Sequence, residues 1–325
     1  MTNWLEDKMK ERKKPNLAYI GTGNISKFHI PALRRSGFNI SSISSRSNSK
    51  NITNFAREFD IKNIIPDWKN LLDNIEKFDA VMIAVNIKST AKILEGLMKT
   101  KKPILVEKPV SLDSKIIDQL LTKNHKNIFV AYNRRHYSST QFAKKFIDSK
   151  PNICANFFIP DRNKISFYQN GCHVIDLMNY FFEKKELEYH TPIFFRRKMT
   201  GFTSVFRTKR GDIINLMSNW GAPSNFKIEL IYKDEKIEMS PIERAYFYKG
   251  LEIIEPNKNN IVRKYIPKLV NESDKKELDE VIKPGFYKQA SLFYNFVKHG
   301  KCDKRLCTLH QAKKTIQIIE QLVTK

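Results

Sequence analysis

The sequence predicts an α/β fold in two parts, a parallel doubly wound sheet followed by an α+β region with a largely antiparallel open sheet. Between residues 17 and 131, short apolar runs alternate with helical apolar periodicity, which is typical of βαβ repeats. After about residue 132 the rhythm changes, and strand-like stretches follow one another closely. We therefore expect a dinucleotide-binding domain over residues 1–131, with residues 1–15 as a charged extension, and a substrate-binding and oligomerisation domain over residues 132–325.

In the first part, strands are recognised as short apolar segments and helices as apolar positions spaced by three and four residues. Ile52, Phe55, Ala56 and Phe59 show the helical spacing, which puts one apolar stripe against a sheet. The run Ala80–Val85 is apolar throughout, as expected for a strand covered on both faces. The expected strands cover residues 17–20, 40–44, 80–85, 104–106 and 128–131, and the apolar positions of the expected helices cover 25–33, 52–59, 93–98 and 116–121.

The second part begins with a helix over about residues 137–148, which ends before Pro151, and has another over about 172–182. Strands are expected at 153–159, 193–197, 203–208, 213–219, 226–232 and 236–239. Gly211-Asp212 and Lys233-Asp234-Glu235 stand where hairpin turns are needed. Residues 255–284 are polar without a clear period and predict a long excursion, and helices near 286–298 and 306–323 close the chain.

Composition excludes several classes of protein. The chain has 325 residues and 41% hydrophobic content, enough to bury a core, so wholesale disorder is excluded. The longest apolar runs are far shorter than the roughly 20 residues that span a bilayer. The first sixteen residues are charged and lack an apolar signal core, and four cysteines without a CxxC make no disulfide framework. We therefore expect a cytoplasmic protein that does not enter membranes.

The net charge of +24 raises the hypothesis of a nucleic-acid-binding protein. The excess is spread evenly, however: residues 1–150 hold 28 basic and 14 acidic side chains (+14), and residues 151–325 hold 30 and 20 (+10). There is no detachable basic tail and no aromatic-basic repeat. We expect no nucleic-acid partner. We also expect no metal, because the seven histidines show no HxxxH or HxH spacing and do not pair with the cysteines.

A candidate cofactor turn, Gly21-Thr22-Gly23-Asn24-Ile25-Ser26, joins the first strand to the first helix. Two glycines permit a tight turn and let the backbone approach a pyrophosphate at the helix N-terminus. Ser26 stands at the third glycine position of GxGxxG, which is a departure. At the end of the second strand, Ser44-Ser45-Arg46-Ser47 offers no carboxylate for a ribose 2′-hydroxyl, and none follows until Glu58. Ser45 and Arg46 therefore favour NADP(H), with NAD(H) as the alternative.

Two segments carry candidate catalytic groups. Glu107-Lys108-Pro109 follows a strand at the expected ligand edge of the sheet, where Lys108 could donate to a substrate oxygen or be one more solvated lysine. Gly171-Cys172-His173-Val174-Ile175-Asp176 opens the helix of the second part. His173 stands in its first turn, three residues before Asp176, which could orient it. The alternative is a helix-terminal histidine with Asp176 in a capping or surface role.

Together these segments resemble one family. The glycine turn with Lys27-Phe28-His29-Ile30-Pro31-Ala32-Leu33, the Glu107-Lys108-Pro109 triplet, Ala131-Tyr132-Asn133-Arg134-Arg135, and the segment 171–176 occur in the order and spacing of the glucose-fructose oxidoreductase / inositol dehydrogenase (Gfo/Idh/MocA) family. The resemblance covers roughly residues 16–325. It implies a Rossmann domain, a C-terminal domain whose open sheet commonly mediates oligomerisation, and hydride transfer between a nicotinamide and a sugar or cyclitol carbon.

The resemblance also implies roles for individual residues. Lys108 would be the active-site lysine and His173 the acid/base residue. Ala84, Val85, Asn86, Glu107 and Lys108 would belong to the cofactor site. Asn133 would lie near nicotinamide and substrate. Beyond the resemblance, we expect Gln169 and Asp176 to contribute to substrate binding.

Two positions depart from the family pattern. Many members have Asp four residues before the histidine, where this chain has Gln169, an amide that cannot transfer a proton as a carboxylate does. The usual Pro-Asn-x-x-His turn after the fourth strand is replaced by Asn86-Ile87-Lys88-Ser89-Thr90.

The leading hypothesis is an NADP(H)-preferring oxidoreductase that is a homo-oligomer, either a dimer or a tetramer. Its substrate would be a sugar, a sugar derivative or a nucleotide-linked sugar, reacting between the two domains. The alternative is a catalytically weak or inactive NAD(P)-binding sensor or subunit of the same fold, which Gln169 motivates.

Overall fold

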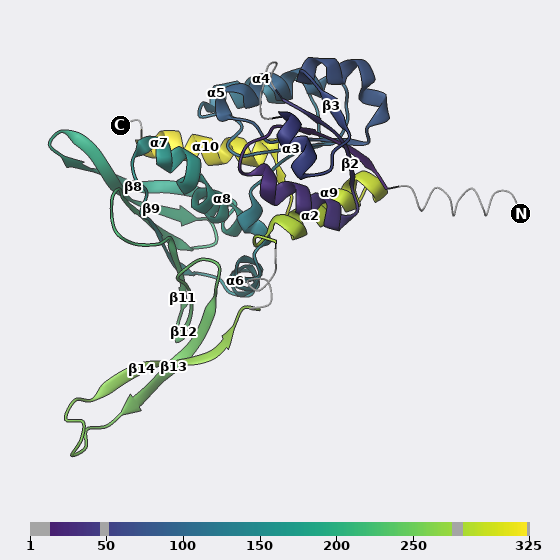
Figure 1. Cartoon of the computed structure of the whole chain (residues 1–325). Coiled ribbons are helices and arrows are strands. Elements are labelled where there is room, and N and C mark those ends of the chain that lie inside the picture. Colours follow the sequence, from purple (N-terminus) through teal and green to yellow (C-terminus); the bar gives the residue numbers. More distant parts are fainter. Residues whose placement is uncertain (1–13, 46–51, 275–281, 324–325) are drawn as a thin grey trace, which may run out of the picture. The chain divides into compact units, whose positions relative to one another are not determined.

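The computed structural model describes residues 14–45, 52–274 and 282–323, and the chain divides into two compact units (Figure 1). Unit 1 comprises Met1–Asn133 and Gly285–Lys313, and unit 2 comprises Arg134–Pro284 and Lys314–Lys325. The first change of unit lies two residues beyond the expected border at 131. Gly285–Lys313, expected in the second domain, instead packs within unit 1.

Unit 1 contains a seven-stranded sheet in the order β15-β6-β5-β4-β1-β2-β3. All neighbours are parallel except β15, which pairs antiparallel with β6. The expected doubly wound sheet is therefore confirmed, and β4 is buried at every residue, as its apolar run predicted. The strands are β1 (Asn16–Ile20), β2 (Asn39–Ser44), β3 (Asn63–Ile65), β4 (Ala80–Ile83), β5 (Ile104–Val106), β6 (Ile128–Val130) and β15 (Cys307–Thr308).

The helices of unit 1 explain why the chain returns to it near residue 285. Helix α2 ends at Gly37, whose φ of +114° suits the glycine and lets its N–H reach the Arg34 carbonyl. Phe38, just beyond, stacks edge-on against Tyr294 of α9, so α9 covers an apolar surface that α2 alone would expose. The helices are α2 (Ser26–Ser36), α3 (Ile52–Glu58), the 3-10 helix η1 (Trp68–Lys77), α4 (Ile87–Met98), α5 (Ser114–Leu121) and α9 (Phe286–His299).

Unit 2 contains an eight-stranded sheet in the order β14-β13-β12-β11-β7-β10-β9-β8. Only β10 and β7 run parallel, which confirms a largely antiparallel sheet. The strands are β7 (Cys154–Ile159), β8 (Lys185–Phe195), β9 (Lys198–Thr208), β10 (Ile213–Asn219), β11 (Lys227–Tyr232), β12 (Glu235–Met239), β13 (Tyr246–Ile254) and β14 (Lys264–Glu272).

Helices cover one face of this second sheet. Phe146 of α6 contacts Phe247 of β13, and Phe167, which begins a π-helical turn, stacks edge-on against Phe202 of β9. Burial alternates along β7, with Ala155, Phe157 and Ile159 turned towards the helices. The helical segments are η2 (Asn133–His136), α6 (Ser138–Asp148), α7 (Lys164–Ser166), η3 (Phe167–Gly171), α8 (Cys172–Phe181) and α10 (Leu309–Val323), of which η2 and α10 each cross from one unit to the other.

Two sequence expectations for unit 2 are wrong. The strand expected at 193–197 spans a hairpin turn, since Arg196 and Arg197 both have positive φ between β8 and β9. The polar excursion expected at 255–284 contains β14, which pairs with β13 in a long two-stranded arm (Figure 1). The sequence of this solvated arm does not show the apolar pattern of a buried strand, because its strands mix charged and apolar residues and contain Pro267. Among the helices of the described chain, none is long and apolar enough to cross a bilayer.

Candidate cofactor and active site

The glycine turn packs tightly against the end of β4. Gly21 has φ +125°, and a Cβ there would lie 2.0 Å from the Ala84 carbonyl oxygen, so no larger residue fits. Ser26 replaces the third glycine without conflict, because it is fully buried and its hydroxyl donates to the Gly21 carbonyl at 3.5 Å. A Cβ at Gly23 would meet no atom within 4 Å, so this side of the turn is open. The backbone at Gly23 is therefore accessible to a ligand at the start of α2.

A cavity of about 710 Å³ lies beside this turn, within unit 1. Its lining includes Gly21, Thr22, Gly23 and Ile25 of the turn, Ser45 after β2, and Ala84, Val85 and Asn86 after β4. Each of these segments follows the carboxyl end of a parallel strand, which is where doubly wound sheets bind ligands. Eight residues that the sequence put in the cofactor site therefore line one cavity.

The other four residues expected in the cofactor site either do not line this cavity or lie outside the described residues. Asn24, Glu107 and Lys108 are not among the residues that line the cavity. Arg46, on which the cofactor preference was based, lies outside the described residues. Conversely, sequence reasoning gave no role to Asp67, Trp68, Lys69, Lys88, Ser89, Lys92 and Ile93, which also line the cavity. A signal for some of them was present, since Asn86-Ile87-Lys88-Ser89-Thr90 had already been singled out as a departure.

The strand end that carries Lys108 is held by a buried carboxylate. Glu107 Oε1 lies 2.5 Å from His29 Nε2 of α2, and Glu107 Oε2 accepts the Lys108 backbone N–H at 3.1 Å. Both side chains of the His29–Glu107 pair are buried, and Phe286 of α9 packs edge-on against the imidazole. Glu107 thus fixes the chain at Lys108, which is itself half-buried. Asn133 is buried just beyond the neighbouring parallel strand β6.

In unit 2, a π-helical turn precedes the helix that carries His173. The turn η3 runs directly into α8, and π-bulges are frequent at functional sites. Asp161, which sequence reasoning missed, holds the junction by accepting the Gly171 N–H at 3.0 Å. Gln169 is exposed on this turn, and His173 is buried in the first turn of α8.

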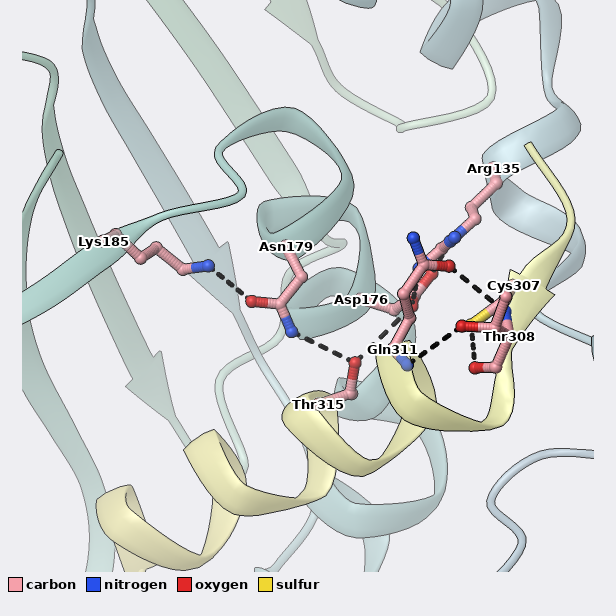
Figure 2. Close-up of polar contacts among 8 residues, drawn as sticks. All are labelled: Arg135, Asp176, Asn179, Lys185, Cys307, Thr308, Gln311 and Thr315. Atoms are coloured by element: carbon pink, nitrogen blue, oxygen red, sulfur yellow. Dashed lines mark hydrogen bonds and ion pairs between the residues drawn. The ribbon is translucent and has the colours of Figure 1, made fainter. Parts of the chain in front are cut away.

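Asp176 forms a buried ion pair with Arg135. Its two carboxylate oxygens accept from Nε and Nη2 of Arg135, each at 2.7 Å, and both side chains are only 1% exposed. Figure 2 shows this bidentate pair at one end of a chain of polar contacts. Through this pair Asp176 joins α8 to η2. Its expected role in substrate binding stays a prediction.

The same chain of contacts continues to the sheet. Thr315 of α10 lies 3.5 Å from Asp176 and accepts from Asn179 at 3.2 Å, and Asn179 in turn accepts from the Lys185 ammonium group (Figure 2). Burial lowers the pKa of Lys185 to about 7, with a smaller contribution from the nearby Lys314 cation. Within the described ranges, no three His, Cys, Asp or Glu side chains are grouped as ligands for a metal.

Comparison with known proteins agrees with this geometry. Residues 16–132 match the model of an oxidoreductase family with an NAD-binding Rossmann fold. A sequence search of curated proteins finds no match. Similar solved structures include a dehydrogenase from Clostridium difficile, with 16% identity and a TM-score of 0.74 over 96% of this chain and 99% of that chain.

Two further structures have named substrates. UDP-N-acetylglucosamine 3-dehydrogenase from Acidithiobacillus ferrooxidans is 15% identical, with a TM-score of 0.72 over 95% of this chain and 97% of its own. The myo-inositol dehydrogenase from Lactobacillus casei, in complex with NAD(H) and myo-inositol, is 16% identical, with a TM-score of 0.67 over 94% and 92%. At these identities the likeness establishes the fold alone.

Proposed function

We propose that this chain, whose residues 16–132 match the model of the Gfo/Idh/MocA oxidoreductases, is a member of that family. We further propose that it is an NADP(H)-preferring oxidoreductase of a sugar or sugar derivative, nucleotide-linked sugars included. The observation that carries the proposal is the cavity at the carboxyl edge of the parallel sheet, open at Gly23. Structures of the same fold act on a cyclitol and on a nucleotide sugar, which supports this class of substrate. When bound, the cofactor supplies the hydride chemistry at its nicotinamide.

The residues around the cavity fit a dinucleotide. The backbone of Gly21–Gly23 and the N-terminus of α2 would hold the pyrophosphate, because the positive end of a helix dipole favours an anion. Ser45 would face the adenosine ribose, since it follows β2, the strand next to β1. No carboxylate stands at Ser44 or Ser45 to repel a 2′-phosphate, and this favours NADP(H) over NAD(H).

Lys108 is proposed as the group that polarises and protonates the substrate oxygen, while His173 exchanges the proton. An ammonium group anchored at a strand end can donate to a carbonyl oxygen that gains hydride, so the developing alkoxide is neutralised as it forms. Glu107 acts indirectly, through the Lys108 backbone N–H. Exposed Gln169 would place the substrate through amide hydrogen bonds.

The test is a Lys108→Ala variant, with Lys115→Ala as the matched control on an exposed helical lysine. We expect turnover of keto-sugars or nucleotide sugars with NADPH to fall by about 100-fold or more. The NADPH dissociation constant should stay within a factor of two, because Lys108 does not line the cavity. Unchanged turnover in Lys108→Ala would refute the catalytic assignment.

A second candidate function is an NAD(P)-binding sensor or subunit without catalysis. It is favoured by Gln169, an amide where many members of the family have a carboxylate. The same experiment separates the two: tight NADPH binding without oxidation across the whole substrate panel would select the sensor.

We also propose that the protein is a homo-oligomer that associates through the face of the second sheet left uncovered by helices. Leu251 and Ile253 of β13 lie directly opposite Pro267 and Tyr265 of β14 and therefore share one face of the arm. Leu251, Ile253 and Tyr265 are 58%, 52% and 58% exposed. Such a contiguous exposed apolar surface is typical of a protein contact, and a second copy of the same sheet supplies the matching apolar face.

A further inference from the structure

One wall of the cofactor cavity has no part in the function proposed so far. It consists of Trp68 and Lys69 at the start of η1 and of Lys88 and Lys92 on α4. These two elements follow β3 and β4, respectively. In the sheet order β4-β1-β2-β3, the start of η1 lies beyond β2, the strand that Ser45 follows. We name these four residues the lysine wall.

Local packing holds the lysine wall in place. Asp67 caps η1 by accepting the Lys69 N–H at 2.9 Å, and Asn86 caps α4 by accepting the Ser89 N–H at 3.1 Å. The Trp68 indole lies directly on α4, because a Cβ at Gly96 would come within 2.6 Å of its ring. Lys88 and Lys92 are four residues apart on α4 and therefore share a face.

The lysine wall carries positive charge that its surroundings do not neutralise. All three lysines are exposed, and among the described residues none of their ammonium groups has an ion-pair or hydrogen-bond partner. Other lysines near the same elements are paired: Lys102 with Glu76 at 3.2 Å and Lys123 with Glu95 at 3.1 Å. The carboxylate that lines the cavity, Asp67, is engaged by the Lys69 N–H. Three cations against one anion favour a ligand with a further negative group.

We propose that Lys69, Lys88 and Lys92 bind the 2′-phosphate of NADP(H), with Trp68 offering its indole face to the adenine. This assignment rests on the proposed function and deepens it by naming residues that select the phosphorylated cofactor. The pyrophosphate has its own place at the glycine turn, where α2 begins. A phosphate monoester carries nearly two negative charges at neutral pH, and several lysines can share it as point charges.

The experiment measures binding by calorimetry, independently of turnover. The titrants are NADPH and NADH, together with 2′,5′-ADP and 5′-AMP, which differ only by the 2′-phosphate. The variants are Lys69→Ala, Lys88→Ala and Lys92→Ala, and the control is Lys99→Ala, an exposed lysine at the far end of α4. Each wall variant should weaken NADPH and 2′,5′-ADP by about tenfold, as for a charge-assisted contact, while NADH and 5′-AMP change less than about twofold. Circular dichroism checks that each variant is folded.

The outcomes distinguish this inference from the proposed function. Equal losses for NADH and NADPH would assign the lysines to the shared pyrophosphate and overturn the inference. Wild-type protein that prefers NADPH while the wall variants behave as Lys99→Ala does would overturn it too, and would leave the proposed function intact. Wild-type protein that binds neither dinucleotide would refute the proposed function, and the inference with it.

Discussion

The two sheets of this protein differ in how many of their faces are covered, and the difference decides where each can meet another molecule. In unit 1 helices lie on both faces, and β4 is buried at every residue (Figure 1). A sheet covered in this way can contact another molecule only at its edges and at the ends of its strands. The glycine turn, Ser45 and Asn86 all stand at the carboxyl ends of strands, around a single cavity.

In unit 2 the helices occupy one face and leave the other open. Along β10, Leu216 and Ser218 are fully buried while Met217 between them is 45% exposed. This second sheet therefore offers a broad surface for contact with another protein, while His173 and Gln169 lie on the helical side. A sheet covered on both faces suits a small ligand at its edge, and a half-covered sheet suits association.

The test of this contrast with the largest expected effect removes a buried ion pair from the helical layer of unit 2. That layer contains the buried Arg135–Asp176 pair, whereas the core of unit 1 is mainly apolar. Asp176→Asn leaves the Arg135 cation buried without its counter-charge, so we expect the free energy of unfolding to fall by about 3–5 kcal/mol in urea titrations. Glu188→Gln removes an exposed pair with Arg207 in the same unit and should cost less than about 1 kcal/mol. Equal effects of the two substitutions would contradict the assignment.

The covered sheet could be predicted from sequence more fully than the half-covered one. A strand buried on both faces has to be apolar throughout, so Ala80–Ile83 can be recognised as a strand in the sequence. A strand in a solvated arm has no such constraint, and Lys264–Glu272 was therefore interpreted as an excursion. The three-residue strand β3 was not predicted for a related reason, because none of its residues is fully buried.

The site divides in the same way. Residues that act through backbone shape, such as Gly21 and Gly23, belong to a local motif and could be found in the sequence. Residues that act through their position in space could not. In the sequence Lys88 is not distinguished from the other lysines, and only the fold shows that α4 places it on the cavity wall. His29 was quoted as part of a motif without a role, and only folding brings it to Glu107, 78 positions away.

The open face of the second sheet is tested by placing charge on it. Leu251→Glu introduces a carboxylate into the apolar face of the arm, where like charges of two copies would meet. We expect an oligomer in wild-type protein and self-association at least about 100-fold weaker in the variant, which corresponds to about 2.7 kcal/mol. Light scattering with size-exclusion chromatography measures this.

The control is Glu252→Lys, which changes charge on the opposite face of the same strand and should leave association intact. A monomeric wild-type protein, or equal effects of both substitutions, would show that the open face does not bind a second copy.

The smallest expected effect concerns how well the helix-covered face of the second sheet excludes water. Lys185 begins β8, and its ammonium group points inward to Asn179 and to the Phe182 carbonyl at 3.0 Å. Burial lowers its pKa to about 7. Below this pH, Lys185 is protonated in both folded and unfolded protein, so its destabilising contribution is constant. Between pH 7 and the ordinary lysine pKa, the unfolded chain holds a proton that the folded chain has released.

Stability should therefore rise with pH in that window, by at most about 1.4 kcal/mol per unit. Urea unfolding at pH 7.5 and 8.5 should show a gain of about 1 kcal/mol in wild-type protein beyond that in Lys185→Met, which has no proton to release. Lys184→Met, on the exposed neighbour, should keep the wild-type slope. If Lys185→Met keeps it as well, water reaches the ammonium group, and the helix-covered face of the second sheet is less dry than the interior of the first.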